Sequence, residues 1–346
     1  MKLQPLAAAV LVCGLGFSAG PVLASDVAEG ERDDSSQYPA EWLERMAEAV
    51  DAISYTGTFV HIGDGRTETL GVVHRGSPDG PRERLFSLTG SQQEVLRDKK
   101  KVRCVHEEAD TKRLDLRQTS ARFFAHVAKD GADSFADAYE LVDLGADRVA
   151  GRPCQVIGIR PLDELRYGFR FWIDRETGMP LRTELVDRDG EALRKLMFTQ
   201  FDPQDEIDDS QLEATLDGDG EAYDTRRASY SDRDREKGQK EAEAWQLDTL
   251  PEGFRISFGT RKSREDGQDL FQLVVTDGLA RVSIFAEALA EGESAMEGIS
   301  SMGLTNAYGR ALEGHQVTVV GEVPSETVRR VAEAVKGLPD AAGDEE

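Results

Sequence analysis

The segment from residue 165 to residue 187 constrains the fold of this chain more than any other, because it has the pattern of a β-hairpin. A period of two places large apolar side chains on one face of its first strand: Tyr167, Phe169, Phe171 and Ile173. The opposite face holds Arg166, Arg170, Trp172 and Asp174. Residues 178–180 form the turn and residues 181–186 the return strand. An aromatic face of this kind is either a surface for apolar ligands or part of a core.

The N-terminus has the features of a secretory signal peptide, which we assign to residues 1–24. Lys2 supplies the positive start, residues 6–17 the apolar run, and Val22-Leu23-Ala24 a cleavage site of small residues. A lipoprotein signal centred on Cys13 is the alternative, although Val12 stands where a small residue is preferred. Residues 25–38 are polar, and we expect them to be disordered. We therefore expect an exported protein.

Two cysteines, Cys104 and Cys154, remain after removal of the signal peptide. In an oxidising compartment they are candidates for a disulfide, and two buried free thiols are the alternative. The net charge of −24 argues against nucleic acid and anionic membrane surfaces as partners.

No residue pattern indicates catalysis, a metal or a cofactor. The five histidines are scattered without metal-ligand spacing, and the sequence lacks a nucleophile elbow, a P-loop and a dinucleotide fingerprint. Residues 217–221 resemble the start of a calcium loop, but Ala222 replaces its required glycine. A basic run at residues 97–103 is either a solvated hairpin turn or a contact for an acidic partner or lipid phosphate. We predict that the chain is not an enzyme.

The alternation of strand-like segments and short turns predicts an α+β protein with two domains. We expect residues 39–224 to form a curved antiparallel sheet, an open half-barrel, with a helix that begins at Pro39 and short helices within residues 121–138. Strands are expected at residues 55–62, 68–75, 84–88, 94–97, 101–106, 152–160 and 193–201, besides the hairpin. Residues 202–224 hold ten acidic residues and no basic ones, and we interpret them as a connector.

A smaller α+β domain is expected at residues 245–338, after a linker at residues 225–244 and before a disordered tail at residues 339–346. Its strands are predicted at residues 254–261, 270–276, 280–286 and 316–323, and a helix follows Pro324-Ser325. The Asp277-Gly278 pair predicts a tight hairpin turn between two of these strands.

Many segments of the chain resemble the MucB/RseB family in the same order. In the first domain they include residues 55–60, 79–85, 94–98, 148–152 and 172–174, and in the second residues 250–254, 277–280 and 282–285. The resemblance implies a periplasmic regulator of an envelope-stress sigma factor, with a larger domain like the lipoprotein carriers. Such a protein binds the periplasmic part of a single-span anti-sigma factor, shields it from proteolysis, and releases it when lipid or lipopolysaccharide binds.

The sequence suggests two sets of site residues. The lipid-binding candidates are large apolar residues of the sheet and its covering segment: Phe59, Leu70, Leu85, Phe86, Phe123, Phe124, Phe169, Phe171 and Phe198. The alternative for each is an ordinary core position. The partner-binding candidates form one hairpin, where we expect an exposed strand able to pair with a peptide: Asp277, Gly278, Val282, Ser283 and Phe285. A carrier of lipids or lipoproteins without a regulatory role is the alternative function, and the second domain argues against it.

Overall fold

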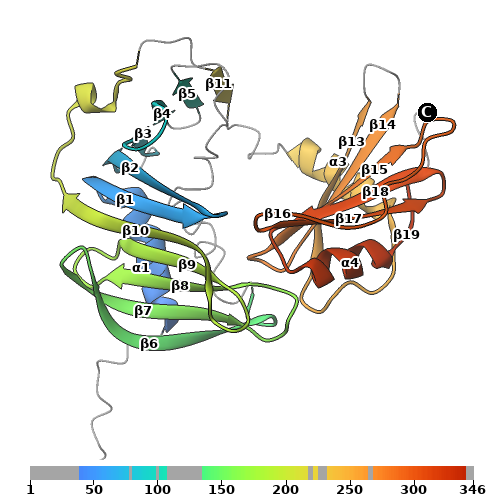
Figure 1. The fold of residues 1–346 in the computed structure, drawn as a ribbon, viewed down its shortest axis with the longest axis horizontal. Helices are drawn as coiled ribbons and strands as arrows, with labels where there is room; N and C mark the ends of the chain where they lie inside the picture. The colour runs from blue at the N-terminus through green and yellow to red at the C-terminus, as the bar shows by residue number, and fades with distance from the viewer. Residues whose placement is uncertain are drawn as a thin grey trace, which may run out of the picture. The chain divides into compact units, whose positions relative to one another are not determined.

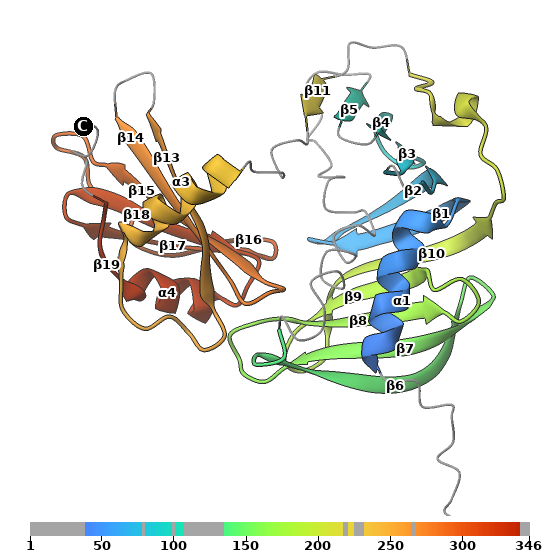
Figure 2. The ribbon, with the colours of Figure 1, turned by 180° about the vertical axis from the view of Figure 1, so that it is seen from behind.

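The structure, a computed structural model, describes residues 39–77, 80–98, 101–106, 135–216, 221–224, 232–263 and 268–339. Within these ranges the chain forms antiparallel sheets of eleven and six strands, a two-stranded ribbon and few helices (Figures 1 and 2). We call the eleven-stranded sheet with helix α1 the larger domain, and the six-stranded sheet with α3 and α4 the smaller domain. The predicted α+β class with a large open antiparallel sheet is confirmed.

Helix α1 (Pro39–Ala52) packs against one face of the large sheet, as Figure 2 shows. Its buried residues recur at helical spacing and form one apolar stripe: Trp42, Leu43, Met46, Ala47, Ala49 and Val50. None of the helices in the described ranges is both long and apolar enough to cross a membrane.

The large sheet has the spatial order β11-β5-β4-β3-β2-β1-β10-β9-β8-β7-β6. Its strands are β1 (Tyr55–Gly63), β2 (Arg66–Arg75), β3 (Arg82–Ser87), β4 (Gln93–Asp98), β5 (Lys101–His106), β6 (Tyr139–Val149), β7 (Arg152–Pro161), β8 (Gly168–Asp174), β9 (Pro180–Val186), β10 (Ala192–Pro203) and β11 (Glu221–Asp224). The predicted hairpin is β8–β9, in which Phe171 lies opposite Thr183 and Trp172 opposite Arg182. The strands predicted at residues 55–106 and 152–201 are confirmed to within a few residues.

Two segments of the larger domain differ from the sequence prediction. Strand β6 was not expected, because its exposed polar residues do not alternate with apolar ones as a half-buried strand would. The acidic stretch after Asp202 is more than a connector, since it contains the short helix η2 (Asp209–Leu212) and strand β11, which pairs with β5. The expected helices at residues 121–138 lie almost wholly outside the described residues.

The smaller domain contains a six-stranded sheet in the order β13-β14-β15-β18-β17-β16. Its strands are β13 (Arg255–Ser263), β14 (Asp269–Thr276), β15 (Arg281–Ala288), β16 (Gly298–Met302), β17 (Thr305–Leu312) and β18 (His315–Gly321). The ribbon pairs β12 (Gln246–Leu247) with β19 (Val335–Gly337). The four predicted strands are confirmed, whereas β16 and β17, which are rich in small and polar residues, were missed.

Two helices complete the smaller domain. Helix α4 (Ser325–Ala334) follows Pro324 as predicted and buries Val328, Val331 and Ala332 in the domain core. Helix α3 (Asp232–Glu243) lies in the stretch that we expected to be a linker. Its Ala242 and the following Trp245 belong to the same core, so the domain begins before residue 245. The linker prediction was wrong because it relied on the high charge of this stretch, and a few apolar residues such as Ala242 are enough to dock a charged helix.

Candidate functional site

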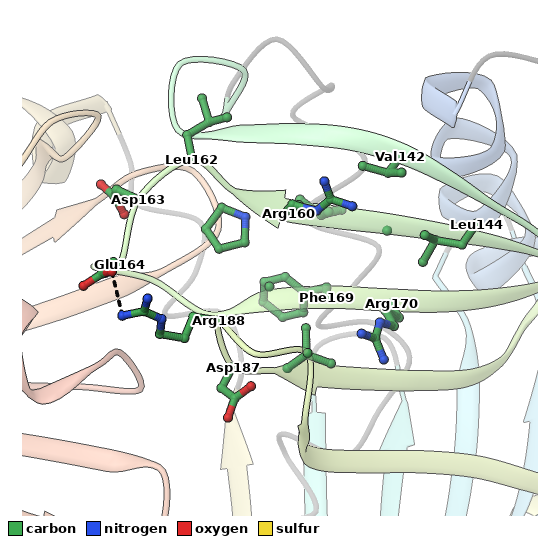
Figure 3. Close-up of a pocket in the computed structure, with 16 residues that line it drawn as sticks. Val142, Leu144, Arg160, Leu162, Asp163, Glu164, Phe169, Arg170, Asp187 and Arg188 are labelled. Atoms are coloured by element: carbon green, nitrogen blue, oxygen red, sulfur yellow. Dashed lines mark ion pairs between the residues drawn. The ribbon is translucent and has the colours of Figure 1, made fainter.

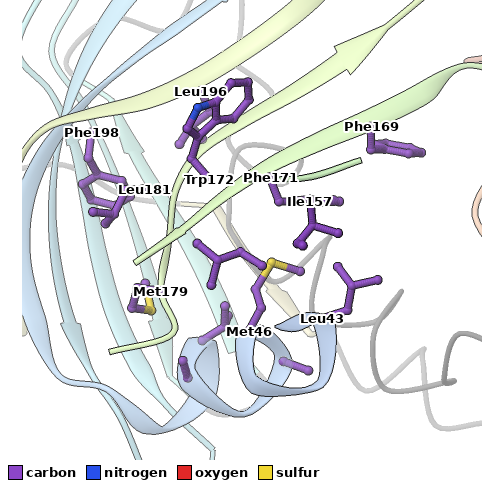
Figure 4. Packing of buried hydrophobic residues seen from close by; sticks show 14 of the residues in the cluster. Leu43, Met46, Ile157, Phe169, Phe171, Trp172, Met179, Leu181, Leu196 and Phe198 are labelled. Atoms are coloured by element: carbon purple, nitrogen blue, oxygen red, sulfur yellow. The ribbon is translucent and has the colours of Figure 1, made fainter. Parts of the chain in front are cut away.

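The apolar face of the large sheet holds most of the predicted lipid-binding residues. Phe59, Leu70, Leu85, Phe169, Phe171 and Phe198 belong to one cluster of buried side chains. Figure 4 shows Leu43 and Met46 of α1 lying against this cluster, beside Ile157 and Phe171. Met46 and Leu70 have no exposed surface, and Phe169 is the most accessible of the six candidates at 8%. These side chains therefore fill a core beneath α1, and lipid binding by them stays a prediction.

Phe86 does not belong to this face. Leu85 is buried in the α1-side core, and successive residues of a strand point to opposite faces, so Phe86 faces away from α1. It packs against the small cluster of Val73, Ile207 and Leu212, with the Arg84 guanidinium 4.8 Å from its ring centroid. The prediction that Leu85 and Phe86 line the same pocket was therefore wrong. Phe123 and Phe124 lie outside the described residues.

A pocket of about 350 Å³ opens on the opposite face of strands β6 to β9 (Figure 3). Its volume is within the lower range of small-molecule sites. Gly158 supplies its floor, since a Cβ there would lie 3.1 Å from the side chain of Leu144. The walls combine apolar side chains with arginines: Val142, Leu144, Leu162, Val186, Arg160, Arg170 and Arg188. Sequence reasoning missed this pocket, although the strand glycines Gly158 and Gly168 were a signal for it.

The arginines of this pocket are neutralised by nearby carboxylates. Arg188 pairs with Glu164 at 2.6 Å and Arg160 with Glu140 at 2.9 Å. The pocket is thus an amphipathic groove in which the charges of Arg188 and Arg160 are balanced by these two carboxylates.

A buried carboxylate lies beside the pocket on the same face. Glu184, with 2% of its side chain exposed, accepts hydrogen bonds from Arg182 at 2.5 Å and lies 3.0 Å from the Lys195 ammonium. Burial alone would raise the pKa of Glu184, but these two cations outweigh burial and lower it. The carboxylate therefore stays ionised and joins strands β9 and β10.

The predicted partner hairpin is β14–β15, and its turn residue Asp277 is buried rather than exposed. One carboxylate oxygen accepts from the main-chain N–H groups of Leu279 at 2.9 Å and Ala280 at 2.7 Å. The other accepts from the Tyr139 hydroxyl at 3.0 Å and lies 3.4 Å from Nε of Arg166. Burial, the dominant cause, raises the pKa of Asp277 despite these donors. Asp277 is therefore a structural residue at this turn.

The expectation of an exposed strand after Asp277 was wrong. Strand β15 lies between β14 and β18 and pairs with both, so its main chain has no open side. Val282 is fully buried, while Ser283 and Phe285 are half-buried. Sequence order could not show that β18 inserts beside β15. The open edges of this sheet are β13 and β16.

The candidate disulfide is absent. Cys104 in β5 and Cys154 in β7 are not bonded to each other, because seven strands separate β5 from β7 in the sheet order. A bridge requires the two Cα atoms to lie within about 7 Å of each other. Burial raises the pKa of the Cys154 thiol to about 11, which keeps it protonated and unreactive.

The basic run at residues 97–103 includes the end of β4 and the start of β5, which pair antiparallel with Asp98 opposite Lys101, in agreement with the hairpin interpretation. Arg97 points inward, where it forms a buried ion pair with Glu83 at 2.9 Å. Lys99 and Lys100 lie outside the described residues. Within the part of the chain that the structure describes, no group of three His, Cys, Asp or Glu residues could hold a metal ion.

These observations define a protein of two sheet domains, with an apolar core beneath α1 in the larger domain and an open sheet edge in the smaller one. The chain belongs to the MucB/RseB family. The model of the MucB/RseB N-terminal domain matches residues 38–216, and that of the C-terminal domain matches residues 239–336. This is a family of regulatory proteins and not of enzymes.

Relatives extend this similarity along nearly the whole chain. The sigma factor AlgU regulatory protein MucB of Pseudomonas aeruginosa is 34% identical over 309 residues, which cover 88% of this chain and 92% of that protein. The sigma-E factor regulatory protein RseB of Escherichia coli K12 is 24% identical over 85% of this chain and 89% of that one. The solved Pseudomonas aeruginosa MucA/MucB complex aligns with a TM-score of 0.66 at 31% identity, over 87% of this chain and 99% of that chain.

Proposed function

We propose that this chain is a periplasmic negative regulator of an envelope-stress sigma factor. It binds the periplasmic part of a single-span anti-sigma factor and shields that part from regulated proteolysis. The observation that carries the proposal is the match of both domains to the MucB/RseB family. MucB has been solved in complex with MucA(peri), in a structure that covers 88% of this chain.

Binding of the anti-sigma factor is tested with the purified chain and the periplasmic part of the single-span anti-sigma factor from the same organism, which we call the cognate fragment. We expect a saturable complex by isothermal titration calorimetry. We also expect slower cleavage of the fragment, when the chain is present, by the protease that starts its regulated proteolysis. A fragment that neither binds nor gains protection would refute the regulatory function and favour the alternative, a carrier of lipids or lipoproteins.

We further propose that a lipid or lipopolysaccharide-derived ligand releases the anti-sigma factor. The acyl chain would enter the larger domain between α1 and the apolar face that holds Phe171 and Phe198. Because Met46 and Leu43 of α1 fill this face, entry requires α1 to move. Burial of ten methylenes contributes about 8 kcal/mol of binding free energy. This exceeds the roughly 5.5 kcal/mol by which a ligand must prefer one state in order to move a two-state equilibrium from about 1:99 to about 99:1.

Linkage makes this release testable. If lipid weakens binding of the cognate fragment by some factor, the fragment must weaken lipid binding by the same factor. Titration of a fluorescent lipid with and without saturating fragment measures this factor directly. We expect at least about tenfold weaker lipid binding in the presence of fragment. Equal lipid affinities would refute release by lipid and leave fragment binding untouched.

A further inference from the structure

Edge strands are sites of unwanted pairing, and the described sheets of this protein protect nearly all of theirs. Strand β6 carries charges such as Glu140 and Arg148 and has a register irregularity between Asp143 and Ala146. Strand β11 is four residues long and begins and ends with an acidic residue. Strands β12 and β19 are only two and three residues long.

Strand β13 is protected in two ways. It carries Arg255, Arg261 and Lys262, and helix α3 packs against it. The approach of α3 is close, since a Cβ at Gly259 would lie 2.6 Å from the main-chain nitrogen of Ala242.

Strand β16 lacks the charges, the irregular register and the very short length of the other edges, and although α4 contacts it, its residues stay exposed. Its sequence, Gly-Ile-Ser-Ser-Met, contains no charge and no proline, and all five residues are exposed. Ile299 is 53% exposed and Met302 is 81% exposed. A neutral, partly apolar and exposed edge of this length is a site where another strand can add.

The register of the β16–β17 hairpin shows which main-chain groups face this open edge. Met302 lies opposite Thr305 across the two-residue turn at Gly303 and Leu304, so these two residues form the hydrogen-bonded pair that closes the hairpin. Hydrogen-bonded pairs alternate along an antiparallel ladder. Ile299 and Ser301 therefore direct their N–H and C=O groups outward.

The exposed side chain of Ile299 gives this edge an apolar surface that an apolar side chain of an added strand can cover. Ile299 lies opposite Tyr308, which packs against the core of the smaller domain. An added strand that places an apolar side chain beside Ile299 would extend this row and remove Ile299 from water. Cross-strand apolar pairs of this kind stabilise a sheet.

We propose that the open edge of β16 binds an extended segment of the anti-sigma factor's periplasmic part as a seventh strand of the smaller sheet. This inference rests on the function proposed above and names the surface that performs it. Three exposed glutamates precede the strand, Glu291, Glu293 and Glu297, in a chain of net charge −24. The segment therefore carries an apolar residue to face Ile299 and a lysine or arginine near Glu297.

The same charges disfavour a second copy of this chain at the edge. Pairing of two β16 strands would bring two molecules of charge −24 together with the glutamates of both copies near the interface. A basic segment gains from the field that repels a second copy.

Substitution of Ser301 tests the proposal. In Ser301→Pro the outward N–H is lost and the proline ring projects toward the added strand, while the ladder to β17 keeps its hydrogen bonds. Ser301→Ala is the matched control, because both variants lose the hydrogen bond between Ser301 Oγ and Asn306 Oδ1, but the alanine keeps its N–H. We expect Ser301→Pro to weaken binding of the cognate fragment by about tenfold or more, and Ser301→Ala by less than about threefold.

Amide hydrogen exchange of the wild-type chain gives a second measurement that does not depend on how the proline variant folds. We expect the Ile299 and Ser301 amides to exchange at least about tenfold more slowly in the complex with the cognate fragment. Equal affinities of the two variants, or unchanged exchange at these amides, would overturn the β16 site. A wild-type dimer by light scattering that dissociates in Ser301→Pro would also overturn it, since a second copy would then occupy the edge. Failure of the wild-type chain to bind the fragment at all would instead refute the proposed function.

Discussion

The turn of the β8–β9 hairpin supports helix α1, and Gly178 is the position where this support can be tested. Gly178 adopts φ of +81°, and a Cβ there would lie 3.0 Å from Cγ and 3.1 Å from the carbonyl oxygen of Arg45. Arg45 in turn donates hydrogen bonds to the carbonyl oxygens of Arg175 at 2.7 Å and Glu176 at 2.8 Å. The substitution Gly178→Ala should therefore strain the turn and push α1 away from it.

Gly178→Ala carries two free-energy costs, one from the backbone conformation and one from the crowded contact, and a control variant separates them. A non-glycine residue in the left-handed region costs about 1–2 kcal/mol. Forcing a methyl group into a packed contact costs roughly a further 1–3 kcal/mol. Gly145 has φ of +85° and no atom within 4 Å of its would-be Cβ, so Gly145→Ala carries the backbone cost alone. We expect Gly178→Ala to lower the free energy of unfolding by about 1–3 kcal/mol more than Gly145→Ala does.

Urea unfolding followed by tryptophan fluorescence measures this difference, since Trp42 is buried on α1. Hydrogen exchange of the α1 amides shows whether the loss is local to the helix. If both variants lose the same free energy within about 0.5 kcal/mol, the turn does not support α1 and the reasoning is wrong. If lipid enters beneath α1, Gly178→Ala should also bind a fluorescent fatty acid more tightly than Gly145→Ala does.

Two further predictions concern the stability of the fold. Met46→Ala should lower the free energy of unfolding by about 2–5 kcal/mol, because Met46 is fully buried. The control Met302→Ala, at a position that is 81% exposed, should change it by less than about 0.5 kcal/mol. Urea titration measures both values. The lowered pKa of Glu184 means that its ion pairs stabilise the fold above the unfolded-state pKa of about 4.3, and that this stabilisation is lost as the pH falls further. The difference in unfolding free energy between wild type and Glu184→Gln should therefore be constant above pH 5 and shrink toward pH 3, and a constant difference would contradict the assignment.

Local patterns in the chain were sufficient to predict the elements that bury alternating or helically spaced apolar residues. The β8–β9 hairpin, helix α1 and helix α4 follow directly from the periods of two and 3.6, because burial on one face selects the residue types. The resemblance to the MucB/RseB family could also be recognised from the sequence alone, since it depends on the order of short segments along the chain.

Tertiary structure decided the rest, because pairing between distant strands leaves little trace in local sequence. The insertion of β18 beside β15 closed the edge that Asp277 to Phe285 was expected to offer, and left β16 open instead. Strand β16 escaped prediction because an exposed edge strand has no core to impose alternation. Likewise, whether Phe171 fills a core or lines a cavity depends on how closely α1 approaches the sheet. Distances between elements, rather than the chemistry of single residues, determine which surfaces of this protein remain free to bind.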